Sequence, residues 1–218
     1  MPRRADPHLH ERLIAAATVE FAESGYAGTT LDAIAARAEV TKGGVYFHFA
    51  GKEELFFAVL DHWREQRRRL LQVPPSGAEG AAGALRTFLS ECLSFHFRQP
   101  AATRLLRVLA TELHGRFTAR LREDDRQERR WLRATVRELL VLGVRDGSLS
   151  VEDPALSAFV LTSAVIGAIE QWQTAPADVE AHCHAGQLAS LLVQPFATGA
   201  ADRASSRGAP GFGDLPEA

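Results

Sequence analysis

The sequence predicts an all-α protein, with an N-terminal three-helix helix-turn-helix domain followed by a larger C-terminal helical domain. Apolar residues recur at helical spacing almost throughout the 218 residues. No run of alternating apolar and polar residues between tight turns predicts a strand. Hydrophobic residues make up 46% and charged residues 24% of the chain, which is typical of a folded globular protein.

Capping residues define the first three helices. Asp6 is a favourable N-cap for the first helix, and Gly25 supplies the left-handed conformation that ends it. Thr30 caps a second helix that runs to about residue 37. Thr41 caps a very short third helix that reaches about residue 47.

A longer fourth helix follows Gly51 and is expected over residues 52–71, because its apolar residues form one packed face. Two prolines in the segment 73–77 break the helical pattern and mark the boundary between the two domains. A turn is expected at 143–150, and the later helices are expected at 81–97, 101–114, 117–142, 153–173 and 177–196. The chain thus divides into a helix-turn-helix region (1–51), a connecting helix (52–72), a C-terminal region (73–197) and a disordered tail (198–218).

Composition excludes several classes of protein. A net charge of −2 means that any nucleic-acid site must depend on local arrangement. The two cysteines are too few for a disulfide scaffold and fit a reducing cytosol. The arginines at the N-terminus precede no apolar segment, so no secretory signal is expected. The most apolar window, 154–169, falls short of the roughly 20 residues of a membrane span, and we expect a cytoplasmic protein with no membrane partner.

Residues 30–49 predict the helix-turn-helix. Ala35 is small enough for two short helices to cross closely. The apolar residues at inward-facing positions are Leu31, Ile34, Ala38, Val40 and Val45. Beyond the Thr41 cap, Lys42 offers a cationic donor, and Gly43 and Gly44 let the backbone approach DNA closely. The geometry alone equally allows a plain three-helix packing unit.

The surrounding residues form a characteristic set over the first quarter of the chain. Its members are Phe21, Gly25-Tyr26, Thr29-Thr30, Ile34-Ala35, Ala38, Val40–Gly43, Tyr46, Phe49 and Lys52–Leu55. In this set the chain resembles the TetR family of bacterial transcriptional regulators. Glu39 departs from the family pattern, which often has glycine in this turn. It must therefore avoid a positive φ or carry strain of about 1 kcal/mol.

The resemblance implies a DNA-binding role for two groups of residues. Those expected to contact phosphates are Thr29, Thr30, Tyr46 and Lys52, and those expected to face the groove are Thr41, Lys42, Gly43, Gly44 and His48. A packing role is the alternative for Tyr46 and His48. Phe47 and Phe49 are expected in the core. Arg3 and Arg4 form either an arm that contacts DNA or a disordered end.

The resemblance also implies a homodimer with a small-molecule inducer. The helix over 153–173 is apolar nearly all round, so one side can face a partner subunit. The expected dimer residues are Val160, Ala164, Gly167, Ala168, Val179, Cys183, Gly186 and Ser190. The pocket candidates, for which plain core is the alternative, are Trp63, Phe88, Cys92, Phe95, His96, Leu105, Leu109, Trp131, Thr135, Phe159 and Trp172. His96 and Gln171 are the candidates for orienting a polar group of the ligand.

Other chemical signals are weak. His182 and His184 lie two residues apart on a helix and point to different faces, so no metal site is expected. Residues 116–133 alternate in charge and are expected to form a solvated helix face. Without a catalytic motif we expect no enzyme and no cofactor. The predicted function is a ligand-responsive regulator, a repressor released from a palindromic operator by a small apolar molecule. The alternatives are a helical enzyme or carrier with an incidental helix-turn-helix, and an oligomerising interaction protein.

Overall fold

Helices account for nearly all of the chain that the computed structural model describes, namely residues 8–72, 79–111, 118–174 and 181–198. The helices are α1 (Leu9–Gly28), α2 (Leu31–Arg37), α3 (Lys42–His48), α4 (Lys52–Leu70), α5 (Gly80–Arg98), α6 (Pro100–Thr111), α7 (Thr118–Arg145), α8 (Pro154–Thr174) and α9 (Ala181–Val193). Within these ranges the β-structure is an isolated bridge between Leu149 and Ala197. The predicted all-α class is confirmed.

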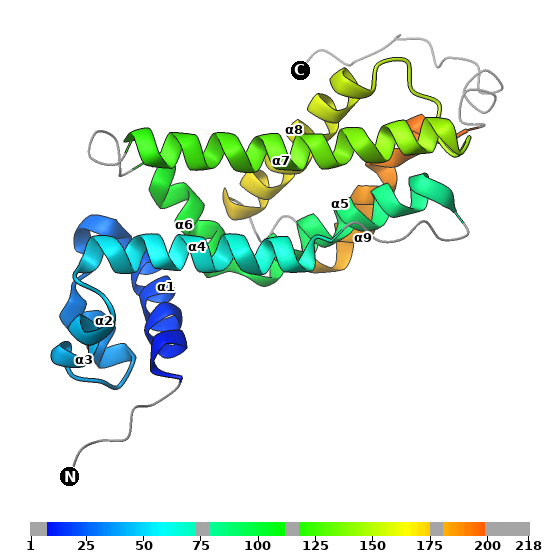
Figure 1. Cartoon of the computed structure of the whole chain (residues 1–218). Helices are drawn as coiled ribbons and strands as arrows, with labels where there is room; N and C mark the ends of the chain where they lie inside the picture. Colours follow the sequence, from blue (N-terminus) through cyan, green and yellow to red (C-terminus); the bar gives the residue numbers. More distant parts are fainter. Residues whose placement is uncertain (1–7, 73–78, 112–117, 175–180, 199–218) are drawn as a thin grey trace, which may run out of the picture.

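The helices form two groups that α4 connects (Figure 1). Helices α1, α2 and α3 lie at one end of the molecule, beside the N-terminal part of α4. In the larger group, α5 packs against α9, α7 and α8, and α7 packs against α8. Helix α6 packs against α1, so the two groups also meet away from α4.

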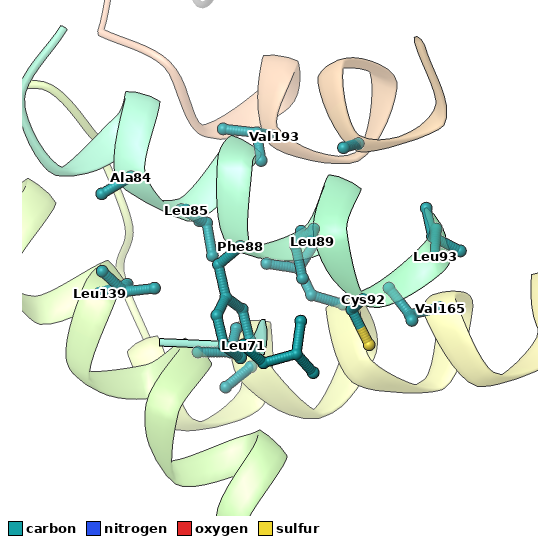
Figure 2. Close-up of a cluster of buried hydrophobic side chains, with 14 of the residues drawn as sticks. Leu71, Ala84, Leu85, Phe88, Leu89, Cys92, Leu93, Leu139, Val165 and Val193 are labelled. Carbon is teal, nitrogen blue, oxygen red and sulfur yellow. The ribbon is translucent and has the colours of Figure 1, made fainter. Parts of the chain in front are cut away.

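Two hydrophobic clusters correspond to these two groups. The N-terminal cluster contains fully buried side chains of α1, α2 and α4, including Phe21, Ile34 and Phe56. Leu105 of α6 and Leu121 of α7 belong to the same cluster. The C-terminal cluster is built around Phe88 and Leu89 of α5, with residues of α7, α8 and α9 packed on them (Figure 2). The helix-turn-helix group therefore shares its core with two helices of the larger group.

The capping predictions hold for the helices of the helix-turn-helix. The Thr30 hydroxyl accepts a hydrogen bond from the Ala33 amide at 3.1 Å, and the Thr41 hydroxyl accepts one from the Gly44 amide at 3.2 Å. Gly25 has a φ of 70° and interrupts the regular geometry of α1 before its last turn. Helix α1 begins at Leu9. Asp6, the expected cap of this helix, lies outside the residues that the structure describes.

The expected turn at 143–150 begins too early, because α7 continues to Arg145. Gly143 lies inside the helix and is buried. A Cβ atom at this position would overlap the Leu149 side chain, which folds back against it. This glycine therefore serves close packing, whereas Gly147, with a φ of 76°, makes the turn itself.

Helix α8 is the most apolar element. Its 21 residues are long and apolar enough, by length and composition alone, to cross a membrane, so the expectation that this segment is too short was wrong. The core helix of a soluble protein meets the same criteria. One side of α8 packs into the C-terminal cluster through Ala158, Leu161 and Val165. The other side exposes the side chains of Leu156, Phe159 and Val160.

Candidate functional site

Helix α3 is held against α2 by one buried face. Val45 is fully buried and Phe49, directly after the helix, is 4% exposed. Ile34 and Ala35 supply the matching face of α2. Glu39 has a φ of 57°, so the turn between the helices adopts the left-handed conformation at a non-glycine residue. The turn therefore carries strain of about 1 kcal/mol. The first two residues of α3 are exposed.

The outward face of α3 is partly aromatic. Lys42 and Gly43 are exposed, Tyr46 is 51% exposed and Phe47 is 82% exposed. The expectation that Phe47 packs in the core was wrong. Consecutive residues of an α-helix are about 100° apart, so Phe47 lies roughly opposite the buried Val45. A phenyl ring this exposed near the C-terminal end of α3 is available to a macromolecular partner.

Lys42 is the exposed cation of this face. Its Nζ donates to Asp32 Oδ2 of α2 at 2.8 Å. This hydrogen bond and the charge of Asp32 raise the pKa of Lys42, so the ammonium stays protonated at physiological pH. Both side chains are at least half exposed, and ion pairs of this kind contribute little to stability. The lysine can therefore exchange Asp32 for a phosphate at small cost.

Thr29 and Lys52, two of the predicted phosphate contacts, bind backbone carbonyls of the protein itself. The Thr29 side chain is 1% exposed and donates to the carbonyl of Gly25 at 2.7 Å, so it closes a turn and does not reach the surface. Lys52 is half-buried, and its Nζ donates to the carbonyls of Tyr26 and Thr29 at 2.8 and 2.9 Å. These contacts tie the start of α4 to the last turn of α1 and to the loop that follows it. A phosphate contact by Lys52 stays a prediction that requires it to leave these carbonyls.

The remaining residues of the predicted DNA face are exposed or half-buried. Thr30, Thr41 and Gly43 are exposed, and Gly44 is half-buried. The His48 ring packs beside His10 and Phe49, with ring centroids 6.0 and 6.4 Å away. His48 is thus half-buried among aromatic rings, which favours its packing role. Arg3 and Arg4 lie outside the described residues.

The aromatic pocket candidates divide between the two clusters. Phe88 and Cys92 are buried in the C-terminal cluster, and Trp131 and Trp172 pack against it. Leu105 belongs to the N-terminal cluster, and Trp63 packs against the same cluster. Phe95 of α5 is buried beside Trp63, with the two ring centroids 6.3 Å apart. Thr135 is 9% exposed and donates to the carbonyl of Trp131 at 3.0 Å.

Phe159, another pocket candidate, lies on the surface of α8. It is 50% exposed, with the Arg133 guanidinium 5.2 Å from its ring centroid, so its place in an enclosed pocket stays a prediction that this exposure does not support. A nearly all-apolar helix gives no sequence signal for which side faces the core. The side chain of the last candidate, Leu109, lies outside the described part of the chain.

Polar side chains gather where the two clusters meet. His96 is 4% exposed, and its Nδ1 lies 3.2 Å from the Thr103 hydroxyl. Gln173, not the predicted Gln171, faces inwards and donates to the Thr103 carbonyl at 3.1 Å. Burial lowers the pKa of His96 to about 3, so the imidazole is neutral above that pH. This region offers neutral hydrogen-bonding groups beside aromatic rings, as small-molecule sites do.

Ion pairs between α4 and α7 were missed from the sequence. Arg64 donates to Asp124 at 2.9 Å, and Arg67 and Arg68 both donate to Glu128. The side chain of Glu128 is only 12% exposed, so the charged stretch 116–133 is not simply a solvated face. The spacing of the charged residues was a signal for these pairs. Arginines 64, 67 and 68 fall on one face of α4, and the acids Asp124 and Glu128 lie four residues apart on one face of α7.

The helix-turn-helix region and the helices around it match a known family. Residues 13–59 match the family model of "Bacterial regulatory proteins, tetR family". The HTH-type transcriptional regulator TtgR of Pseudomonas putida is 30% identical over 193 residues, which cover 83% of this chain and 89% of TtgR. The chain belongs to the TetR family. It is therefore a transcriptional regulator with a helix-turn-helix DNA-binding region.

Further matches extend over most of this TetR-family regulator. The uncharacterized regulator YhgD of Bacillus subtilis (strain 168) is 26% identical over 84% of this chain and 93% of YhgD. NalD, the secondary repressor of the MexAB-OprM multidrug efflux pump in Pseudomonas aeruginosa, has a TM-score of 0.65 at 21% identity, covering 88% of this chain and 96% of NalD. SmeT in complex with triclosan has a TM-score of 0.67 at 22% identity, covering 96% and 99%. At these identities the two structures show that the fold is shared.

The candidate dimer residues of the regulator lie on a partly exposed surface of α8 and α9. Val160 is 52% exposed, and Ala164, Gly167 and Ala168 are half-buried. A Cβ atom on Gly167 would have no neighbour within 4 Å. Gly186 and Ser190 of α9 are exposed, and Leu191 beside them is 64% exposed. Val179 and the Cys183 side chain lie outside the described residues.

A hollow of about 530 Å³ opens on the outside of the regulator, where α4 begins. Its lining residues are Ala50, Gly51, Glu53, Glu54, Phe57, Ala58, Asp61 and Arg120. None of the predicted pocket residues is among them. The hollow is open to solvent, and the Arg120 guanidinium covers the Phe57 ring at 3.7 Å.

Proposed function

We propose that this TetR-family regulator is a homodimeric, non-enzymatic repressor in the cytoplasm that leaves a palindromic operator when a small, mostly apolar molecule binds among its C-terminal helices. The observation that carries the DNA-binding part is the exposed face of α3. It combines a protonated lysine, a glycine and two exposed aromatic rings on a capped helix held against α2. A helix presented in this way suits the major groove.

Within this face we assign separate roles. Lys42, Tyr46 and the exposed Thr30 contact phosphates, and the backbone at Gly43 approaches the groove. Phe47 contacts base edges, because an apolar ring can pack against the methyl group of thymine. Thr29 and Lys52 act indirectly, since they hold the loop that positions α2.

The exposed side of α8 supports the homodimer. Leu156, Phe159 and Val160 form a contiguous apolar surface, and each side chain is at least half exposed. Such a surface is unfavourable in water and favourable against an identical copy related by a two-fold axis. A dimer places two α3 helices on successive half-sites about 34–36 Å apart, or a multiple of that distance.

The shared core supports effector control. Leu105 of α6 and Leu121 of α7 pack with α1 and α4 in the N-terminal cluster. A molecule that binds where the two clusters meet and moves α6 or α4 therefore also moves the helix-turn-helix group. Coupling of about 1–3 kcal/mol changes operator affinity by about 5- to 150-fold. SmeT, a protein of the same fold, is known in a complex with triclosan.

The proposal is tested by titrating labelled duplexes from beside the regulator's own gene and following fluorescence anisotropy. A repressor binds one of these duplexes far more tightly than a scrambled duplex, with strong salt dependence. Compounds that raise the thermal stability of the protein then release that duplex. A carrier or enzyme with an incidental helix-turn-helix binds the compounds but prefers no duplex.

A further inference from the structure

Arg67 of α4 is a largely buried arginine whose hydrogen bonds are incomplete. Its side chain is 16% exposed, and one terminal nitrogen of the guanidinium donates to Glu128 of α7. The Nε atom is buried and has no hydrogen-bond partner among the residues that the structure describes. A buried charged donor without an acceptor is costly, which means that an acceptor placed here gains a strong interaction.

Besides the charged Glu128, three uncharged side chains lie within the electrostatic reach of Arg67. The guanidinium lies 5.9 Å from the centroid of the Trp131 ring. Its charge also reaches Cys92 and His96 of α5, where it lowers the pKa of both. Burial keeps the thiol protonated, with a pKa of about 11, and the imidazole neutral, with a pKa of about 3. Neither group supplies an anion at physiological pH.

Glu128 does not fully balance the positive charge, because it serves two arginines. Its other oxygen accepts from Arg68 at 2.6 Å. The Arg68 side chain is 46% exposed, so water solvates it, whereas Arg67 lacks that access. One carboxylate thus faces two guanidinium groups, and the buried one keeps a free donor.

We propose that the effector of this regulator is an apolar carboxylic acid whose carboxylate binds Arg67 through the buried Nε–H. The acid's apolar part lies against Trp63, which is one turn before Arg67 on the same face of α4, and against Phe95. Arginine suits a carboxylate because its N–H groups match the two oxygens. The inference rests on the effector response proposed above and specifies the chemical class of the effector.

The same contact gives the acid a way to act on DNA binding. Arg67 joins α4 to α7 through Glu128, and α4 continues into the N-terminal cluster. An acid on Arg67 competes with Glu128 for the guanidinium and weakens this link. Helix α4 is then free to shift, and the spacing of the two α3 helices changes.

The experiment uses straight-chain and aryl-substituted carboxylates, each paired with its primary amide, on the full chain. Affinity is measured by calorimetry, and operator release by anisotropy. The wild type is expected to bind the best acids about 10- to 100-fold more tightly than their amides, as a charge-assisted hydrogen bond in a buried site provides. Arg67→Gln removes this preference. The matched control Arg69→Gln, an arginine whose side chain is 70% exposed on the same helix, retains it.

A second variant leaves Arg67 in place. Glu128→Gln removes the competing anion, so it is expected to bind acids more tightly than the wild type and amides with unchanged affinity. The inference is overturned if amides bind as tightly as acids, if Arg67→Gln keeps the preference, or if Glu128→Gln weakens acid binding.

The two proposals fail in different ways. If amides release the operator as well as acids do, effector control stands and the carboxylate assignment falls. If no compound in the series changes the anisotropy of the operator complex, effector control falls and the assignment with it.

Discussion

The pair formed by Lys42 and Asp32 allows a test in which two neighbouring substitutions act in opposite directions. In the free protein the lysine Nζ is 2.8 Å from Asp32 Oδ2. Lys42→Ala removes a cation that we assign to a phosphate, so operator affinity falls. Asp32→Asn frees the lysine and removes a negative charge beside the DNA, so affinity rises. A purely structural ion pair predicts that both changes act in the same direction.

The salt dependence fixes the magnitude. Each phosphate contact contributes about 0.9 to the slope of log affinity against log salt, so one Lys42 in each subunit of a dimer contributes about 1.8. Between about 50 and 200 mM salt, wild-type affinity is therefore expected to fall about 12-fold more than that of Lys42→Ala. Unfolding midpoints are expected to be unchanged, because both side chains are at least half exposed.

Fluorescence anisotropy over a series of salt concentrations measures the slope, and circular dichroism confirms the fold. The matched control is Arg69→Ala, which breaks an exposed pair of the same length with Glu65 near the C-terminal end of α4. This control leaves slope and affinity unchanged. Equal slopes for the wild type and Lys42→Ala, or a loss of affinity in Asp32→Asn, would refute the reasoning.

Three further predictions concern other parts of the molecule. Phe47→Ala is expected to change the free energy of unfolding by no more than about 0.5 kcal/mol, yet to weaken operator binding. The variant is also expected to bind duplexes with uracil in place of thymine as tightly as the unsubstituted duplex. A remaining preference for thymine would contradict the assigned contact. Val160→Asp is expected to give helical monomers in light scattering, whereas Leu70→Asp, on the exposed end of α4, stays dimeric. His96 has a pKa near 3 when folded and an ordinary value of 6.5, so the unfolded chain binds a proton first as the pH falls. Urea titrations are expected to show that the wild type loses about 2 kcal/mol more stability than His96→Gln between about pH 7 and pH 5; parallel losses in the two proteins would exclude this role.

Local features of the fold could be predicted from the sequence because they depend on neighbouring residues. Thr30 and Thr41 cap α2 and α3 as expected, and α2 has its expected bounds. Glu39 adopts the strained alternative that the turn allowed. Phe47 was misassigned because apolar character was weighed above its angular position relative to Val45.

The effector region could be predicted only in part, since burial there depends on contacts between distant segments. Leu105 was expected near the ligand but belongs to the core of the DNA-binding group. The spacing of arginines on α4 and of acids on α7 marks Arg67 and Glu128 as candidates, but their pairing depends on α4 and α7 lying alongside each other (Figure 1). The burial of Thr29 could not be predicted either, because the sequence does not show whether a threonine hydroxyl at this position is buried or exposed.

The central claim, a dimer that presents two α3 helices to a palindromic operator, is tested most directly by hydroxyl-radical footprinting. The full chain is bound to duplex DNA from beside its own gene. Such a dimer protects two half-sites related by two-fold symmetry, with centres about 34–36 Å apart or a multiple of that distance. Protection of a single unsymmetrical site, or no protection at concentrations where the protein is dimeric, would contradict it.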